Sequence, residues 1–255
     1  MPAQPSKDWT IVLDIHADDM LRRVRNLHEL SGRSDHGQTE FITRKILSEL
    51  RITPRDRVVD IGCGDGTLLL FALQAGVTDA IGLSGSEEEA ERLRALGLNV
   101  RQGWTDALPL PDGSASAIVC HSVLHIVPPE KIPASLREIA RIANPGAGIW
   151  IGELPRFREP ASIRNFKSVP EMLWWLLRKR GVRAFLGMWR RLLSGAQQGP
   201  VLTTAQAFWA EPEQFVRMAA DAGLKIERHF PNQVLNSQQH LVESATRHDY
   251  LLRRE

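Results

Sequence analysis

The chain has 255 residues, of which 43% are hydrophobic and 24% charged, and its net charge at neutral pH is +2. This composition favours a soluble enzyme with a sizeable core, and no run approaches the roughly 18 apolar residues of a membrane span. The first residues have no apolar signal core, so we expect a cytoplasmic protein. The two cysteines, Cys63 and Cys120, indicate reduced thiols, and no Cys/His spacing predicts a metal site.

The chain is expected to begin with a helical N-terminal cap, residues 1–51, which ends in an amphipathic helix from Thr39 to Leu50. An apolar strand then runs into three alternate glycines, in the order Arg57-Val58-Val59-Asp60-Ile61-Gly62-Cys63-Gly64-Asp65-Gly66-Thr67. Glycines allow a sharp turn, and a helix starting near Thr67 would aim free N–H groups at an anionic ligand group. The spacing does not fit the dinucleotide pattern G-x-G-x-x-G, which excludes the simplest dinucleotide loop.

Strands are expected near 57–61, 79–83, 98–102, 116–121 and 147–153, and helices near 66–76, 86–96 and 129–143. Ser86 is the expected N-cap of the second of these helices. Such alternation predicts a parallel sheet with helices on both faces. Further along, a helix at 211–223 and a strand at 224–228 precede an expected antiparallel strand at 245–252.

Several motifs in this order resemble the class I S-adenosylmethionine-dependent methyltransferases, of the type 11 kind. The loop D-x-G-x-G-x-G resembles the first motif of that family, and Leu108-Pro109-Leu110-Pro111-Asp112-Gly113-Ser114 resembles its "LPFPDGSFD" stretch. The segment from Ala117 to His125 resembles the fourth strand and the "vLHH" motif that follows it. The resemblance covers roughly Ile52 to Glu153 and, more loosely, Glu211 to Arg254.

The resemblance implies an α/β fold, a Rossmann-like seven-stranded sheet with helices on both faces. The cofactor-binding core would comprise residues 52–153 and 205–255, with a helical insertion at 154–204 after the fifth strand. The implied cofactor is S-adenosyl-L-methionine. Asp60 would reach its amino end, although a turn-capping role is the alternative, and the backbone of Cys120 and His121 would accept from its amino group. The glycine loop would contact the methionine and ribose portions through Gly62, Cys63, Gly64 and Gly66.

The sequence departs from the family at two positions of the cofactor site. Ser84 stands where the family usually carries an acid for both ribose hydroxyls, and a neutral hydroxyl binds more weakly than a carboxylate. Trp104 stands where an acid commonly recognises adenine, and it would either stack on the adenine or pack as a core indole. Thr105 belongs to the same expected cofactor-binding segment, and Asp106 could accept from the adenine amine. The departures leave a catalytically silent scaffold as a rival interpretation.

The expected reaction is methyl transfer to a small-molecule or glycosidic acceptor, with oxygen preferred over nitrogen or carbon. Alignment of the acceptor with the methyl–sulfur bond would do most of the work, and a hydroxyl acceptor benefits from a histidine base. His121 and His125 follow the fourth strand, Glu153 ends the fifth, and His36 precedes the cap helix. For each of these candidates the alternative is a packing or structural role.

The insertion is strongly basic, with ten Lys and Arg against two Glu between Arg156 and Arg191, although the whole chain carries only +2. It also contains Trp174, Trp175, Trp189, Phe166 and Phe185. The segment could act as a lid that clamps an anionic acceptor, lie peripherally on an anionic membrane, or pack its aromatics on the core with its charges solvated. Nucleic acid is not indicated, because the basic residues form no recognition motif, and the oligomeric state stays open.

Overall fold

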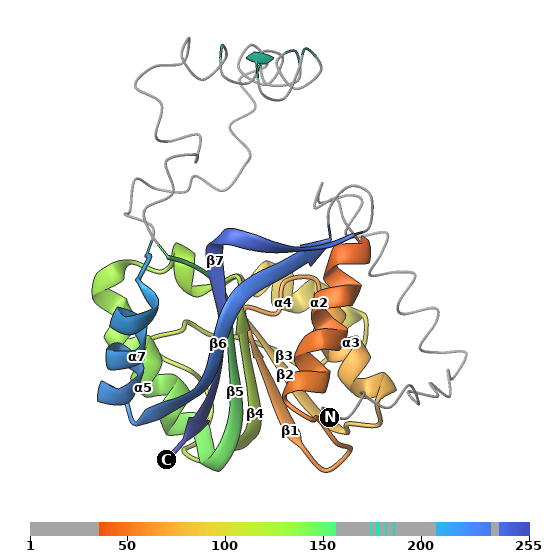
Figure 1. The fold of residues 1–255 in the computed structure, drawn as a ribbon. Helices are drawn as coiled ribbons and strands as arrows, with labels where there is room; N and C mark the ends of the chain where they lie inside the picture. Colours follow the sequence, from red (N-terminus) through yellow and green to blue (C-terminus); the bar gives the residue numbers. More distant parts are fainter. Residues whose placement is uncertain are drawn as a thin grey trace, which may run out of the picture. The chain divides into compact units, whose positions relative to one another are not determined.

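A seven-stranded sheet organises the part of the chain that the computed structural model describes, which is residues 36–156, 208–235 and 240–255 with isolated helical positions between 174 and 186 (Figure 1). The strand order is β3-β2-β1-β4-β5-β7-β6. The strands are β1 (Arg57–Ile61), β2 (Asp79–Ser84), β3 (Val100–Gln102), β4 (Ala115–His121), β5 (Ala143–Pro155), β6 (Leu224–Leu235) and β7 (Leu241–Arg254). The predicted α/β class and seven-stranded sheet are confirmed.

The strand order reverses beside β1, because β2 and β3 follow on one side of it and β4 and β5 on the other. β1 pairs in parallel with β2 on one side and with β4 on the other, and β4 pairs in parallel with β5. β7 is antiparallel to both of its neighbours, β5 and β6, as the antiparallel strand predicted at 245–252 requires. In open α/β sheets ligands bind at such a reversal point, beyond the carboxyl ends of the strands. The topology therefore directs attention to the loops after β1 and β4.

Two helical layers cover the sheet, one on each face (Figure 1). The helices are α2 (His36–Glu49), α3 (Thr67–Gln74), α4 (Glu87–Ala95), α5 (Ile132–Ile142) and α7 (Pro212–Asp221), with 3-10 turns η1 (Leu124–Ile126) and η2 (Pro129–Lys131). Side chains alternate across each strand, so Val58 joins the core under α2, α3 and α4, whereas Val59 joins the core under α5 and α7. No helix among the described residues is long and apolar enough to cross a bilayer.

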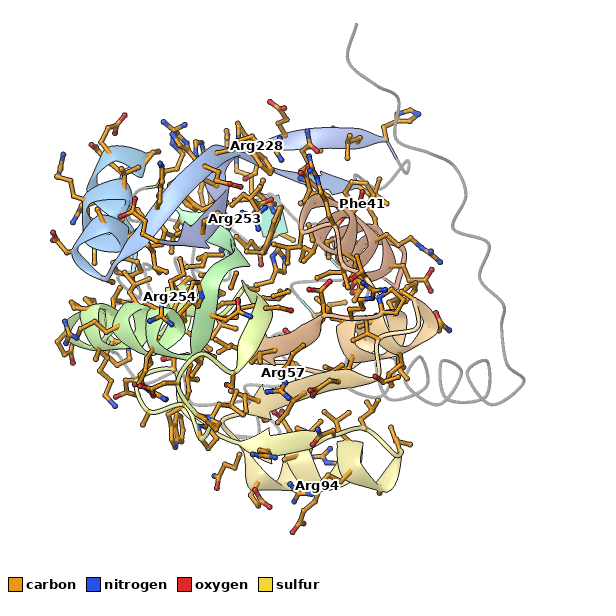
Figure 2. The ribbon with its side chains drawn as sticks, turned by 90° about the horizontal axis from the view of Figure 1, so that it is seen from below. Phe41, Arg57, Arg94, Arg228, Arg253 and Arg254 are labelled. Atoms are coloured by element: carbon orange, nitrogen blue, oxygen red, sulfur yellow. The ribbon has the colours of Figure 1, made fainter. Side chains whose placement is uncertain are left out.

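Charged side chains form ion pairs and hydrogen bonds at the amino-terminal edge of the parallel strands, opposite the edge where a ligand is expected. Figure 2, viewed from below, shows Arg57 at the start of β1, where its Nε lies 2.5 Å from a carboxylate oxygen of Asp79 on β2. Arg253 of β7 donates to Glu227 at 3.0 Å and to the Gly146 carbonyl at 3.1 Å. Such exposed pairs contribute little energy each, and their placement leaves the carboxyl edge free for function.

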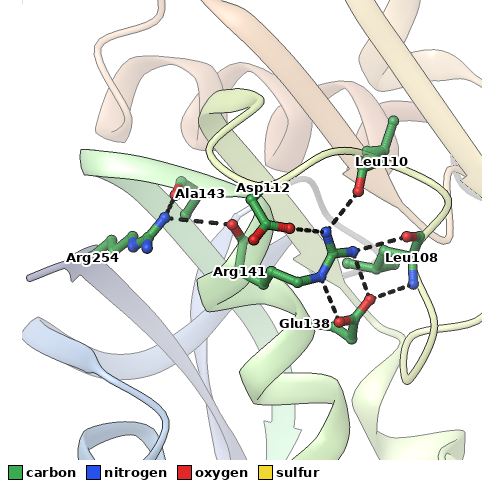
Figure 3. Close-up of polar contacts among 7 residues, drawn as sticks. All are labelled: Leu108, Leu110, Asp112, Glu138, Arg141, Ala143 and Arg254. Carbon is green, nitrogen blue, oxygen red and sulfur yellow. Dashed lines mark hydrogen bonds and ion pairs between the residues drawn. The ribbon is translucent and has the colours of Figure 1, made fainter.

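Arg141 of α5 holds the segment that follows β3 (Figure 3). Its guanidinium donates to the carbonyls of Leu108 and Leu110 at 3.0 and 2.8 Å and to the carboxylate of Asp112 at 2.7 Å. Glu138, which forms a two-pronged pair with Arg141, also accepts from the Leu108 amide at 2.8 Å. Much of the segment from Leu108 to Asp112 therefore has a structural role.

The structure corrects several predicted boundaries. The helix expected at 129–143 is divided into η2 and α5, and Pro133 stands in the first turn of α5, where its missing N–H costs no hydrogen bond. β5 begins at Ala143 instead of 147, with Gly146 at φ 78° and a register shift against β4. Residues 1–35 of the predicted cap, and most of the predicted insertion, lie outside the described residues.

Candidate functional site

The glycine loop after β1 has the backbone that its sequence predicts. Gly62, Gly64 and Gly66 all have positive φ, at 75°, 54° and 80°. The amides of Gly62 and Cys63 donate to the Leu83 carbonyl at 2.8 and 3.0 Å, which ties the loop to β2. α3 then begins at Thr67, whose amide donates to the Asp65 carboxylate at 3.0 Å. The loop is thus a rigid cradle at the reversal point of the sheet.

Asp60 lies buried at the carboxyl end of β1, only 5% exposed. No hydrogen-bond donor from the described residues reaches its carboxylate, and burial raises the pKa of Asp60 to about 7. A buried acid without a donor suits a cationic ligand group, so this position fits the amino end of S-adenosylmethionine. The Cys63 sulfur packs where a side chain on Gly82 would lie, 2.7 Å from a Cβ built there, so Cys63 offers a ligand its backbone.

The end of β2 carries a hydroxyl that is already engaged. The Ser84 Oγ donates to a carboxylate oxygen of Glu89 at 3.0 Å and accepts from the Ser86 amide at 3.1 Å. Glu89 stands in the first turn of α4, where Ser86 caps the helix as predicted. The sequence interpretation considered Ser84 alone and missed Glu89. The acidic run Glu87-Glu88-Glu89 after a neutral strand end is the signal that could have indicated it.

Trp104, Thr105 and Asp106 follow β3 and have different surroundings. Trp104 is 61% exposed, and its ring lies against Gly85, with Cζ3 3.3 Å from a Cβ built on that glycine. The alternative of a buried core indole is therefore wrong. The Thr105 hydroxyl bonds to the Ser135 hydroxyl at 2.8 Å, and Asp106 pairs with Lys131 at 2.9 Å, which lowers the pKa of Asp106. Recognition of adenine by Asp106 would compete with that ion pair.

His121 ends β4, and its ring lies against Gly152 of β5. A Cβ built on Gly152 would lie 2.2 Å from the His121 Nδ1, so only glycine leaves room for the ring. The Trp150 indole donates to this Nδ1 at 3.4 Å. Because an indole can only donate, the neutral imidazole carries its hydrogen on Nε2. Burial lowers the pKa of His121, and the nearby carboxylates of Glu153 and Asp249 oppose this effect. Cys120, before it, is fully buried, and burial raises the pKa of its thiol.

Glu153 lies in a left-handed backbone conformation, at φ 61°, near the carboxyl end of β5. Its amide donates to the buried Asp249 carboxylate at 2.9 Å, and its own carboxylate pairs with Arg247 at 3.3 Å. Ser122, just after His121, also has positive φ, at 58°. Such conformations are costly for non-glycine residues and cluster at functional sites. The two positions mark the β4 and β5 ends as the candidate acceptor side.

Asp249 and Lys45 form a buried pair that the sequence interpretation did not include. Asp249, on β7, is 0% exposed and accepts from the Asn232 amide at 3.0 and 3.2 Å. The Lys45 ammonium of α2 lies 3.6 Å from Asp249 and 4.6 Å from the Phe230 ring centroid. Burial lowers the pKa of Lys45. The available signal in the sequence was a charged residue, Asp249, directly before the apolar run Tyr250-Leu251-Leu252.

The two remaining catalytic candidates are His125 and His36. His125 lies in η1, and its carbonyl accepts from the Phe208 amide at 3.2 Å. His36 is the first residue of α2. Within the described ranges, no three His, Cys, Asp or Glu side chains are grouped so that they could hold a metal ion.

Comparisons with known proteins agree with this geometry. Residues 58–146 match a family model described as a methyltransferase domain. The chain is 26% identical to the O-methyltransferase resE of Aspergillus sclerotiorum, over 57% of this chain and 61% of that protein. It is 29% identical to the 27-O-demethylrifamycin SV methyltransferase of Amycolatopsis mediterranei, over 49% and 48%. The chain thus spans about half to three fifths of these curated relatives.

A solved structure shows the same fold. The S-adenosylmethionine-dependent methyltransferase from Mesorhizobium loti matches with a TM-score of 0.55 at 19% identity, over 84% of this chain and 96% of that one.

Proposed function

We propose that the chain is a class I S-adenosylmethionine-dependent methyltransferase and that it methylates an oxygen atom of a small-molecule or glycosidic acceptor. The observation that carries this proposal is the group of polar side chains at the carboxyl ends of β4 and β5 and on the facing part of β7, beside the glycine loop. The Glu153 amide donates to the Asp249 carboxylate there at 2.9 Å, and both acids act to raise the pKa of His121 against the larger effect of burial. Two relatives whose names specify O-methylation support the preference for oxygen.

In the proposed reaction the protein binds and aligns its ligands. Once bound, S-adenosylmethionine supplies a methyl group that its sulfonium makes electrophilic. Asp60 and the backbone of the glycine loop would hold the cofactor, and the Nε2–H of His121 would donate to the acceptor and orient its oxygen. Holding two reactants in line recovers the entropy of a bimolecular encounter, which can lower the barrier by roughly 7–11 kcal/mol.

Incubation of the protein with methyl-labelled cofactor and a set of hydroxylated metabolites and glycosides tests the proposal. We expect label in an ether or ester product. Label transferred only to nitrogen or carbon would favour the runner-up acceptor classes. Cofactor binding without transfer to any acceptor would favour the rival interpretation, a catalytically silent scaffold, which Ser84 and Trp104 first suggested.

Replacing His121 with phenylalanine should lower turnover at least tenfold and leave cofactor affinity within about twofold. The phenyl ring fills the space over Gly152 but cannot donate to an acceptor. Because burial lowers the pKa of His121, its Nδ1 should keep accepting from the Trp150 indole through pH 7. The wild-type rate should fall only in more acidic buffer, where protonation of Nδ1 breaks that hydrogen bond and releases the ring. His125→Phe is the matched comparison. Full activity of both variants at every pH would leave alignment alone as the mechanism.

We also propose that the insertion, which was predicted at 154–204 but can begin only after β5 ends at Pro155, chooses the acceptor as a basic helical lid and does not hold the cofactor. Support comes from its excess of basic residues. Residues Arg158–Ala207 form a compact unit of their own, and within it the Arg178 guanidinium lies 5.1 Å from the ring centroid of Trp174. Lids of this kind commonly control substrate choice.

Replacing Arg178, Lys179, Arg180 and Arg183 with glutamine should raise the KM for an anionic acceptor severalfold, since four positive charges are lost. Calorimetry should show unchanged cofactor binding. On the membrane interpretation, the same variant should lose binding to anionic liposomes. Unchanged acceptor kinetics together with unchanged liposome binding would reduce these residues to a solvated surface.

A further inference from the structure

The three glutamates that open α4 have different partners. Glu87 pairs with Arg94 at 2.5 Å, and Figure 2 shows Arg94 on α4. Glu88 pairs with Arg92 at 3.1 Å, one helical turn along. Glu89 has no cationic partner among the residues that the structure describes. Its carboxylate instead accepts a hydrogen bond from the Ser84 hydroxyl at 3.0 Å, which draws it to the carboxyl end of β2.

Ser84 is well placed to hold a carboxylate but poorly placed to bind a ligand itself. Its hydroxyl has a single hydrogen, which is donated in the hydrogen bond to Glu89. The same oxygen accepts a hydrogen bond from the Ser86 amide at 3.1 Å. The Ser84 carbonyl accepts from the Gly103 amide at 2.9 Å. The strand end therefore presents the Glu89 carboxylate, whose second oxygen makes no hydrogen bond within the described residues.

We propose that Glu89 is the residue that accepts hydrogen bonds from the ribose hydroxyls of S-adenosylmethionine, and that Ser84 is the positioning residue that holds it. A carboxylate can accept from both hydroxyls of a vicinal diol, and such charge-assisted bonds are about twice as strong as neutral ones. Glu89 is exposed to solvent, so a ligand can reach it. The inference rests on the cofactor and is independent of the methyl acceptor.

Two neighbours of Glu89 support this placement. The negative charge of Glu89 contributes to the raised pKa of the Cys63 thiol, after burial and the charge of Asp60, so the carboxylate lies close to the glycine loop. Between Ser84 and Ser86, Gly85 lies against the exposed ring of Trp104. The turn between β2 and α4 thus carries an exposed aromatic ring on which the base of a nucleoside could stack.

Calorimetric titration with S-adenosylhomocysteine tests the proposal without any turnover. Glu89→Gln should weaken binding at least tenfold, because a hydrogen bond to a charged group contributes about 1.5–3 kcal/mol and 1.4 kcal/mol is a factor of ten. Glu88→Gln is the matched control, since it removes an acid from the same helical turn, and it should stay within twofold of wild type. Unchanged melting temperatures would show that both variants fold.

Analogues of S-adenosylhomocysteine that lack the 2′ or the 3′ hydroxyl identify the contact. The wild-type protein should bind at least one deoxy analogue about tenfold more weakly, whereas Glu89→Gln should show little further loss. The double variant Ser84→Asp, Glu89→Gln should recover most of the affinity, since it moves the carboxylate onto the strand end.

Two results would overturn the proposal. One is an affinity of Glu89→Gln equal to that of Glu88→Gln. The other is a Glu89→Gln variant that binds both deoxy analogues about tenfold more weakly than it binds S-adenosylhomocysteine. That result would place the ribose contact elsewhere. Neither result would bear on the acceptor, because no methyl transfer is measured.

Discussion

Replacing Gly62 with alanine is expected to lower the affinity for S-adenosylhomocysteine at least a hundredfold. Gly62 has φ 75°, and a Cβ built there lies 2.3 Å from Cγ2 of Val123. The left-handed conformation costs an L-residue about 1–2 kcal/mol, and the contact would also displace the loop after β4. Both walls of the cofactor site would move, and a rigid cradle depends on positions accurate to a fraction of an ångström.

Gly113→Ala is the control for backbone strain. Gly113 has φ 58°, but nothing lies within 4 Å of a Cβ built on it. Its amide donates to the Arg141 carbonyl at 2.9 Å, a bond that alanine keeps. We expect Gly113→Ala to lose about 1 kcal/mol of stability and to bind the ligand normally. Equal affinities for the two variants would show that the geometry of Gly62 does not form the site.

The fold followed from local signals in the sequence. Alternation of apolar strands with helices predicted the parallel order from β1 to β5, and the positive φ angles at Gly62, Gly64 and Gly66 match the turn that their spacing requires. The N-cap at Ser86 was predicted from residues within one turn of it. Such features depend on neighbours in the sequence, so a single chain reveals them.

The contacts between distant segments did not follow from the sequence. Lys45 and Asp249 are about two hundred positions apart and pair only because β7 lies between β5 and β6 while α2 packs on the same face. The engagement of Ser84 by Glu89 depends on the angle at which α4 leaves β2. The exposed position of Trp104 results from the packing of its ring against Gly85, which lies in another segment of the chain. Residue type alone would favour burial of a tryptophan.

Replacing Asp60 with asparagine is expected to stabilise the unliganded protein at pH 8 and to abolish tight cofactor binding. No donor from the described part of the chain reaches the buried Asp60 carboxylate, and burial raises the pKa of Asp60 from 3.8 to about 7. The folded protein thus holds the Asp60 proton more tightly than the unfolded chain. The stability associated with this proton is fully present below pH 4 and is lost as the pH rises through 7.

The magnitude follows from the shift of the pKa. A difference of about 3 units corresponds to roughly 4 kcal/mol, an upper limit for the gain from Asp60→Asn at pH 8. At pH 5 the gain in the free energy of unfolding should shrink to roughly 2 kcal/mol. The effect develops between the unfolded pKa of 3.8 and the folded pKa of about 7, and most of that interval lies above pH 5. Urea unfolding at both pH values measures it. Asp79→Asn, which removes a half-exposed carboxylate from the neighbouring strand, is the control and should give no such gain.

Cofactor binding should reverse this effect through the same carboxylate. The cationic amino group favours ionised Asp60, so binding at pH 6 should release close to one proton, and affinity should rise as the pH increases towards 8. The Cys63 and Cys120 thiols near Asp60 stay protonated throughout, because burial, and secondly the Asp60 charge, raises the pKa of each. Calorimetry in two buffers of different ionisation enthalpy counts the proton. Binding without proton release at pH 6, or Asp60→Asn with wild-type affinity, would remove Asp60 from the cofactor site.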